Sequence, residues 1–190
     1  DDHGHVTKMH YDVRGRRIQL DDPDQGTTIF DYNGFGNLYK SIHAASGQVK
    51  NYHHDDLGRL IWTSDPDGLT TFVWDSSPSG IGRLATTLSP DNIATQHRYD
   101  SAGRVTGMDL FDEQSTQYSI DMDYVPAGGP LSGRPSMLSY PNVPGRTRFA
   151  VANGYNGSGY VDKVNGLVTP GQAHQTLWTV NERNRDMALV

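Results

Sequence analysis

Short runs of alternating or β-branched residues dominate the chain. Residues 117–124 alternate polar and apolar side chains over eight positions, the pattern of a strand with one buried face. Residues 27–32 and 70–74 are rich in β-branched and aromatic residues, as strands prefer. No segment has the apolar spacing of an amphipathic helix. The pattern therefore predicts an all-β protein.

A short phrase recurs along these runs. The phrase begins with an aromatic residue, which is followed by Asp or Asn and then by two variable residues. Next come a Gly, then either Arg or Asn, and finally an aliphatic residue. We call the first residue the head of a repeat. Heads stand 20 to 31 residues apart, at Tyr11, Tyr32, His54, Trp74 and Tyr99, and in weaker form at Tyr124, Tyr155 and Trp178. The phrase at Trp74 carries a four-residue insertion. Recurrence at this spacing indicates stacked structural units.

We predict that the phrase is a structural motif formed by Tyr11, Asp12, Gly15, Arg16, Tyr32, Gly36, His54, Asp55, Gly58, Arg59, Trp74, Asp75, Gly82, Arg83, Tyr99, Asp100, Gly103 and Arg104. An Asp side chain can accept a hydrogen bond from the backbone two residues on, and Gly tolerates the left-handed conformation that follows. Each phrase therefore predicts a tight turn after a strand.

A second turn signal lies between the heads. A proline precedes several heads by 8 to 11 residues, in Asp22-Pro23, Asp65-Pro66, Ser89-Pro90, Val143-Pro144 and Thr169-Pro170. Proline fixes the backbone angle of the first central position of a turn. Each repeat is thus predicted to be a β-hairpin, and about seven to eight hairpins would form one long twisted antiparallel sheet. A β-propeller is the competing architecture, but a blade needs about 40 residues, roughly twice this repeat.

The regularity of the repeats changes along the chain. Residues 1–125 are predicted to be regular hairpins. From residue 126 the phrase loosens, with an irregular segment at 126–135 and an imperfect head with an Asn-Gly hairpin signal at 153–159. We predict that residues 126–190 are degenerate repeats that continue the same sheet.

Composition narrows the function classes. The net charge is −6 and no block of basic residues occurs, which disfavours nucleic acid as a partner. The absence of cysteine excludes disulfides, thiolate zinc sites and a cysteine nucleophile. No apolar run approaches the length that spans a bilayer, and no secretory signal opens the chain. We interpret the chain as a piece of a longer protein, because its last residues form neither a turn nor a cap.

The repeated phrase resembles the YD or RHS repeat family, which includes the Rhs polymorphic toxins of bacteria, the C component of insecticidal toxin complexes and the animal teneurins. The resemblance is specific across residues 9–105 and weaker from 124 to 185. His54 in place of Tyr and the insertion after Trp74 depart from the pattern. The resemblance implies hairpins wound into a hollow shell. In bacterial members this shell looks like a container for a toxic polypeptide, usually the C-terminal part of the same chain.

The chemically active side chains fit structural roles better than a catalytic site. His53 and Asp55 could share a strand face, as could His3 and His5, but neither pair has a third metal ligand at a fixed spacing. The aspartates recur with the repeat, whereas an active site needs convergence. We therefore predict no catalytic residue, no metal and no cofactor. A paired-carboxylate glycosidase site is the enzymatic alternative.

Two rows of side chains could serve either packing or binding. The arginine that follows the glycine should pair with the Asp of the same or the next turn, and a basic ligand-binding row is the alternative. The heads should form an aromatic ladder that packs repeat on repeat. A stacking platform for sugars is the alternative if the rings face solvent.

The sequence thus predicts a structural section of an RHS-type shell in a secreted or cell-surface protein, with no catalysis of its own. Its partners would be the remainder of the same polypeptide, both shell and cargo, and copies of itself that pair through open sheet edges. No membrane insertion by this segment is expected. A carbohydrate-binding or cell-adhesion module resembling the teneurin shell is the alternative function.

Overall fold

The chain is built from strands and turns. A computed structural model describes residues 6–167 and 175–180, and these residues contain no helix. Their strands are β1 (Lys8–Tyr11), β2 (Arg17–Asp22), β3 (Gly26–Tyr32), β4 (Leu38–His43), β5 (Val49–His54), β6 (Leu60–Asp65), β7 (Gly68–Trp74), β8 (Leu84–Leu88), β9 (Ala94–Tyr99), β10 (Val105–Phe111), β11 (Gln117–Tyr124), β12 (Pro135–Ser139), β13 (Ala150–Tyr155), β14 (Val161–Leu167) and β15 (Gln175–Thr179). The prediction of an all-β chain is confirmed.

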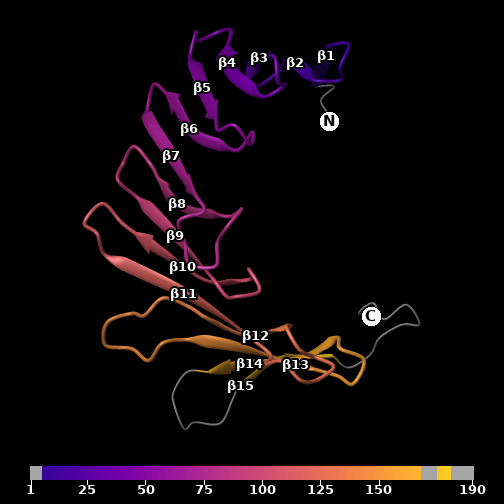
Figure 1. The fold of residues 1–190 in the computed structure, drawn as a ribbon, viewed down its shortest axis with the longest axis vertical. Coiled ribbons are helices and arrows are strands. Elements are labelled where there is room, and N and C mark those ends of the chain that lie inside the picture. Colours follow the sequence, from indigo (N-terminus) through magenta and orange to yellow (C-terminus); the bar gives the residue numbers. More distant parts are fainter. Residues whose placement is uncertain (1–5, 168–174, 181–190) are drawn as a thin grey trace. The chain divides into compact units, whose positions relative to one another are not determined.

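The strands follow one another in chain order. The described residues form a 15-stranded sheet in which each strand is hydrogen-bonded to its neighbour in the sequence (Figure 1). Pairing is antiparallel, for example between β2 and β3 and between β10 and β11. This is the topology of consecutive hairpins and not of four-stranded propeller blades. By its contacts the chain divides into two units, residues 1–74 with 86–94 and residues 75–85 with 95–190. The predicted division after residue 125 stays a prediction.

Turns of the predicted kind join the strands. Between β2 and β3, the Asp22 carboxylate accepts hydrogen bonds from the backbone N–H groups of Asp24 and Gln25, at 3.0 and 2.9 Å. Asp65 accepts a similar bond from Asp67 between β6 and β7. The turn between β10 and β11 contains no proline and was not predicted. It is organised by Asp112, whose carboxylate accepts hydrogen bonds from the backbone N–H groups of Gln114 and Thr116. The turn predicted at 169–171 lies outside the described residues.

Few side chains are fully buried. Among the described residues, the buried apolar ones are Ala85 and Ala150, with exposed fractions of 3% and 8%. Most strand side chains are half-buried. Because no deep core forms among the described residues of either unit, the stability of each hairpin depends on contacts with the adjacent hairpins, as in other repeat proteins. The residues that make contacts between successive repeats are therefore the first candidates for a functional role.

Candidate functional site

The turn that follows each head is organised by its aspartate. In the first repeat the Asp12 N–H donates to the Arg16 carbonyl at 2.9 Å, and the Gly15 N–H donates to the Asp12 carbonyl at 3.0 Å. Asp12 Oδ1 also accepts bonds from the N–H groups of Arg14 and Arg16, both at 2.9 Å. Gly15 has φ +75°, which Gly adopts without strain. Asp55 and Asp100 organise their turns in the same way.

The arginine of the phrase pairs with the aspartate of its own turn. Arg16 Nε and Nη2 lie 2.7 and 2.6 Å from Asp12 Oδ2. Arg104 Nε and Nη2 each lie 2.7 Å from Asp100 Oδ2. The backbone N–H and the guanidinium of Arg104 both hold the pKa of Asp100 below its ordinary value, as Arg16 does for Asp12. The sequence left open whether the arginine pairs with the Asp of the same turn or of the next turn. In the structure these arginines pair with the Asp of the same turn.

The other side of the guanidinium contacts the next repeat. The Arg16 guanidinium carbon lies 4.7 Å from the centre of the Tyr32 ring, within cation–π range. In the described residues the contact recurs in Arg59–Trp74 at 5.2 Å, Arg83–Tyr99 at 5.5 Å, Arg104–Tyr124 at 4.3 Å and Arg134–Tyr155 at 5.6 Å. Each arginine thus links its own turn to the following head.

The heads also donate a hydrogen bond back to the preceding repeat. Tyr32 Oη donates to the Arg17 carbonyl at 2.8 Å. The acceptor is always the residue after the arginine, as in Trp74–Leu60, Tyr99–Leu84, Tyr124–Val105 and Tyr155–Pro135. We call the guanidinium, the ring that it covers and this hydrogen bond a joint. Since the ring polar atom is satisfied, the aromatic side chain packs without the cost of an unpaired donor.

Joints replace the aromatic ladder that the sequence predicted. In the described part of the chain, ring–ring contacts join His53 to Trp62 and Tyr140 to Phe149, and neither pair consists of two heads. The heads are separated by guanidinium groups instead. One ring face is therefore covered by protein, which reduces the surface that a sugar could stack on.

The glycine of the phrase has a second role. Apart from its φ of +73°, Gly103 lies under the Arg83 guanidinium, so a methyl group there would come within 2.8 Å of Arg83 Nη2. At this distance the guanidinium would have to move aside. Gly159 stands in the same relation to Arg134, with a closest approach of 2.6 Å. In these two turns the glycine therefore provides both the turn conformation and the space for the preceding arginine.

A register shift precedes the heads. His10 pairs with Gln19 but Tyr11 pairs with Arg17, so Ile18 is an extra residue in β2. Similar shifts precede Tyr32, His54, Tyr124 and Tyr155. A β-bulge of this kind redirects the side chain next to it. The bulges were not predicted from the sequence, because they lie at the strand ends beside the turns, where too few residues follow to show a change in the polar–apolar alternation.

Further turns of the repeat lie after residue 124. Gly133 and Arg134 complete the phrase that starts at Tyr124, after an inserted loop like the one after Trp74. Asn153 and Gly154 lie in β13 and form no turn. The turn is instead at 156–160, where Asn156 Oδ1 accepts bonds from the N–H groups of Ser158 and Tyr160. The Gly-Arg pair at 133–134 was the signal that could have revealed this joint.

Of the remaining predicted motif residues, Asp75 and Gly82 occupy an altered turn. The Asp75 N–H donates to the Arg83 carbonyl at 3.0 Å across the inserted loop, and Asp75 Oδ1 accepts from the Gly82 N–H. Gly36 and Gly58 have the positive φ of their counterparts, +92° and +77°. His54 stands apart: in the described part of the chain, it makes neither the arginine contact nor the back-donated hydrogen bond.

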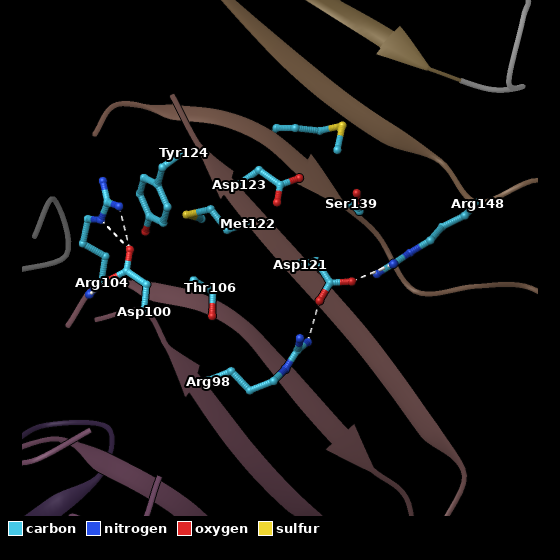
Figure 2. A pocket seen from close by; sticks show the side chains of 11 residues that line it. Arg98, Asp100, Arg104, Thr106, Asp121, Met122, Asp123, Tyr124, Ser139 and Arg148 are labelled. Atoms are coloured by element: carbon cyan, nitrogen blue, oxygen red, sulfur yellow. Dashed lines mark hydrogen bonds and ion pairs between the residues drawn. The ribbon is translucent and has the colours of Figure 1, made fainter. Parts of the chain in front are cut away.

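A network of charges lies over β9 to β11 and the β12–β13 connection (Figure 2). Asp121 lies between two arginines, 2.6 Å from Arg98 Nη2 and 2.6 Å from Arg148 Nη1. Arg98 Nε also lies 3.0 Å from Asp109 Oδ2. Burial raises the pKa of Asp121, but the two guanidinium groups outweigh burial and the net pKa is lowered. The two arginines and two aspartates balance in charge, and their ion pairs join the strands that carry them.

This network borders a shallow hollow of about 580 Å³, where Arg104 and Tyr124 of one joint also lie. No group of three or more His, Asp or Glu residues within residues 6–167 and 175–180 could hold a metal ion. His3 and His5 lie outside the described residues. Likewise, the described part of the chain has no helix with the length and apolarity needed to span a membrane.

Comparisons with known proteins agree with this geometry. No protein-family model matches the chain. Human teneurin-1 is 30% identical over 141 residues, which cover 67% of this chain and 5% of teneurin-1. Double-stranded DNA deaminase toxin A of Burkholderia cenocepacia is 27% identical over 126 residues, which cover 54% of this chain and 8% of the toxin. The chain thus spans a small part of the relatives that it matches.

The fold has a solved counterpart. A chain in the crystal structure of TcdB2–TccC3–Cdc42 aligns over 95% of this chain and 10% of its own length, with a TM-score of 0.66 and 14% identity. At that identity the match establishes the fold alone. The repeated phrase and its turns, the sequence similarity to teneurin-1 and this shared all-β fold identify the chain as a member of the RHS/YD repeat family.

Proposed function

We propose that the chain is a structural section of an RHS-type shell that encloses a polypeptide cargo, such as the toxic C-terminal part of a secreted bacterial protein. The observation that carries this proposal is the joint. Within each unit, a guanidinium and a head hydrogen bond tie a repeat to the next one at regular intervals. A sheet reinforced in this way is suited to act as a wall.

The mechanism would be steric. Every internal strand of the sheet is hydrogen-bonded on both sides, so few backbone groups are available to a protease or to a foreign strand. The relatives support this role: one is a toxin in Burkholderia cenocepacia, and the fold recurs in a complex that contains TccC3. The chain supplies only a section, and its partners would be the remainder of the same secreted or cell-surface polypeptide.

Limited proteolysis of the complete parent polypeptide tests the container. With wild-type joints, the cargo should resist digestion at protease concentrations that degrade it when it is expressed alone. The double variant Arg83→Ala with Arg104→Ala should expose the cargo, because it removes two joints. Arg14→Ala is the matched control, since this exposed arginine precedes Gly15 and its guanidinium makes no contact with a head among those found in the described residues. Equal digestion of free and enclosed cargo would contradict the proposal.

A cell-adhesion or carbohydrate-binding module is the second candidate, favoured by the similarity to teneurin-1. Titration of tryptophan fluorescence with oligosaccharides, together with a cell-binding assay, separates the two functions. A shell section should give no saturable response. Self-association through β1 and β15, the first and last strands of the described sheet, is a further prediction, and a monomeric profile in light scattering at high concentration would contradict it.

A further inference from the structure

One joint of the first unit lacks all three of its usual side chains. In the repeat headed by Tyr32, Asn33 replaces the usual Asp and Asn37 replaces the usual Arg. The head of the next repeat is His54 in place of Tyr or Trp. The turn itself is intact, because Asn33 Oδ1 accepts bonds from the N–H groups of Phe35 and Asn37 at 3.0 Å. The backbone has thus kept the geometry of a joint while the side chains that fill it are replaced.

A cavity of about 590 Å³ lies at this position. Its lining residues are Asn33, Phe35, Asn37, His54, Asp55, Asp56, Leu57 and Gly58. The Asn37 amide reaches Gly58, where a methyl group would lie 3.6 Å from Nδ2. Arg83 and Arg134 pack over the corresponding glycines of their own joints and also cover the head ring. The side chain of Asn37 is too short to do both, so the space beside the His54 ring is left open.

The charges around the cavity favour a cation. Asp55 is paired with Arg59, whose Nε lies 2.7 Å from Asp55 Oδ2. Asp56 is exposed, and we find no ion pair for it within the described residues. The lining carboxylates and Arg59 therefore sum to one negative charge, which a single guanidinium would balance. Two exposed apolar side chains flank the opening, Phe35 at 96% and Leu57 at 77% exposure.

We propose that this cavity binds the guanidinium of an arginine side chain from another polypeptide segment. The guanidinium would stack on the His54 ring, as the internal arginines do on their heads, and would pair with Asp56. Phe35 and Leu57 would contact an apolar residue next to that arginine. The strongest argument is internal: the same position of the motif holds a guanidinium in five joints of the described chain.

Titration followed by amide NMR tests this proposal on the full 190-residue chain. The probes are methylguanidinium, N-acetyl-arginine amide, an Arg-Leu dipeptide amide and the matching Lys-Leu amide. We expect saturable shifts confined to residues 33–37 and 54–58, tightest for Arg-Leu and at least fivefold weaker for Lys-Leu. The Lys comparison is informative because an ammonium group cannot stack as a planar guanidinium does.

Two variants make the result decisive. Asn37→Arg should fill the cavity from within and weaken Arg-Leu binding at least tenfold, and Asp56→Asn should weaken it severalfold without changing the fold. Shifts that persist unchanged in both variants, or no shift for any probe, would overturn the proposal. If methylguanidinium binds as tightly as Arg-Leu, the site takes free guanidinium compounds, and the assignment to a polypeptide is wrong.

Discussion

The Arg104 guanidinium carbon lies 4.3 Å from the centre of the Tyr124 ring, while its nitrogens hold Asp100 at 2.7 Å. Asp100 belongs to the same turn as Arg104, whereas Tyr124 is the head of the next repeat. One side chain therefore connects a turn to its neighbour, and its loss should affect both the turn and the contact between repeats.

Replacement of Arg104 by alanine should destabilise the second unit. Loss of the cation–π contact alone accounts for about 0.5–1 kcal/mol, and the turn loses its ion pair in addition. Arg104→Lys should recover little, because an ammonium group cannot both lie flat on the ring and bond the carboxylate through two nitrogens. Urea denaturation followed by tryptophan fluorescence measures the change in midpoint. Arg14→Ala should leave the midpoint unchanged, and an equal fall in that control would contradict the role of the joint.

Removal of the Tyr124 hydroxyl isolates the hydrogen bond of a joint. In Tyr124→Phe the Val105 carbonyl loses a donor that now lies at 2.8 Å, while the ring remains available to Arg104. We expect a loss of about 0.5–1.5 kcal/mol in the free energy of unfolding. Tyr39→Phe is the control, because Tyr39 is 46% exposed and we find no hydrogen bond of its hydroxyl within the described residues. A joint that needs only the ring would give the two variants equal midpoints.

The sequence predicted the local geometry of the fold but not the contacts between repeats. Asp12 and Gly15 belong to one turn, and their spacing is enough to predict that turn. The contact of Arg16 with Tyr32 depends instead on how neighbouring strands pair, and this pairing includes register shifts beside Tyr11 and Tyr32. The Arg98–Asp121 pair likewise joins residues 23 positions apart through strand register. Register is set by pairing across strands and is not encoded within five residues.

The glycine positions offer a comparison of steric and conformational costs. Gly103→Ala must adopt φ +73° and also place a methyl group 2.8 Å from Arg83. Gly47→Ala must adopt φ +68°, but nothing lies within 4 Å of the new methyl group. The conformational cost, about 1–2 kcal/mol, should be common to both. Thermal unfolding should therefore show a larger loss for Gly103→Ala, and equal losses would mean that the guanidinium moves aside without cost.

Acidification should weaken the repeats in a defined direction. The pKa values of Asp12 and Asp100 are lowered in the folded state, foremost by the backbone N–H groups of Arg16 and Arg104. Their stabilising contribution is complete above the unfolded-state pKa of about 3.9 and is lost as the pH falls through the folded value. Denaturation midpoints should thus be constant near neutral pH and fall below about pH 4.

Asp100→Asn checks the origin of this pH dependence. The amide keeps the acceptor for the N–H groups of Ala102 and Arg104, but it cannot ionise. The variant should be less stable near neutral pH and should lose less stability on acidification than the wild type. A slope in the acid range that matches the wild type would assign the effect to other carboxylates.

Completion of the open joint should stabilise the first unit. In the triple variant Asn33→Asp, Asn37→Arg and His54→Tyr, the new guanidinium can pair within its turn and cover the new ring, whose hydroxyl can donate to the Leu38 carbonyl. The ring contact and hydrogen bond together predict a gain of about 1–2 kcal/mol. A double-mutant cycle between positions 37 and 54 measures their coupling. We expect the variant with both replacements to be more stable than the sum of the two single effects predicts. If Asn37→Arg and His54→Tyr were additive, the two side chains would not meet, and the open joint could not be the counterpart of the complete ones.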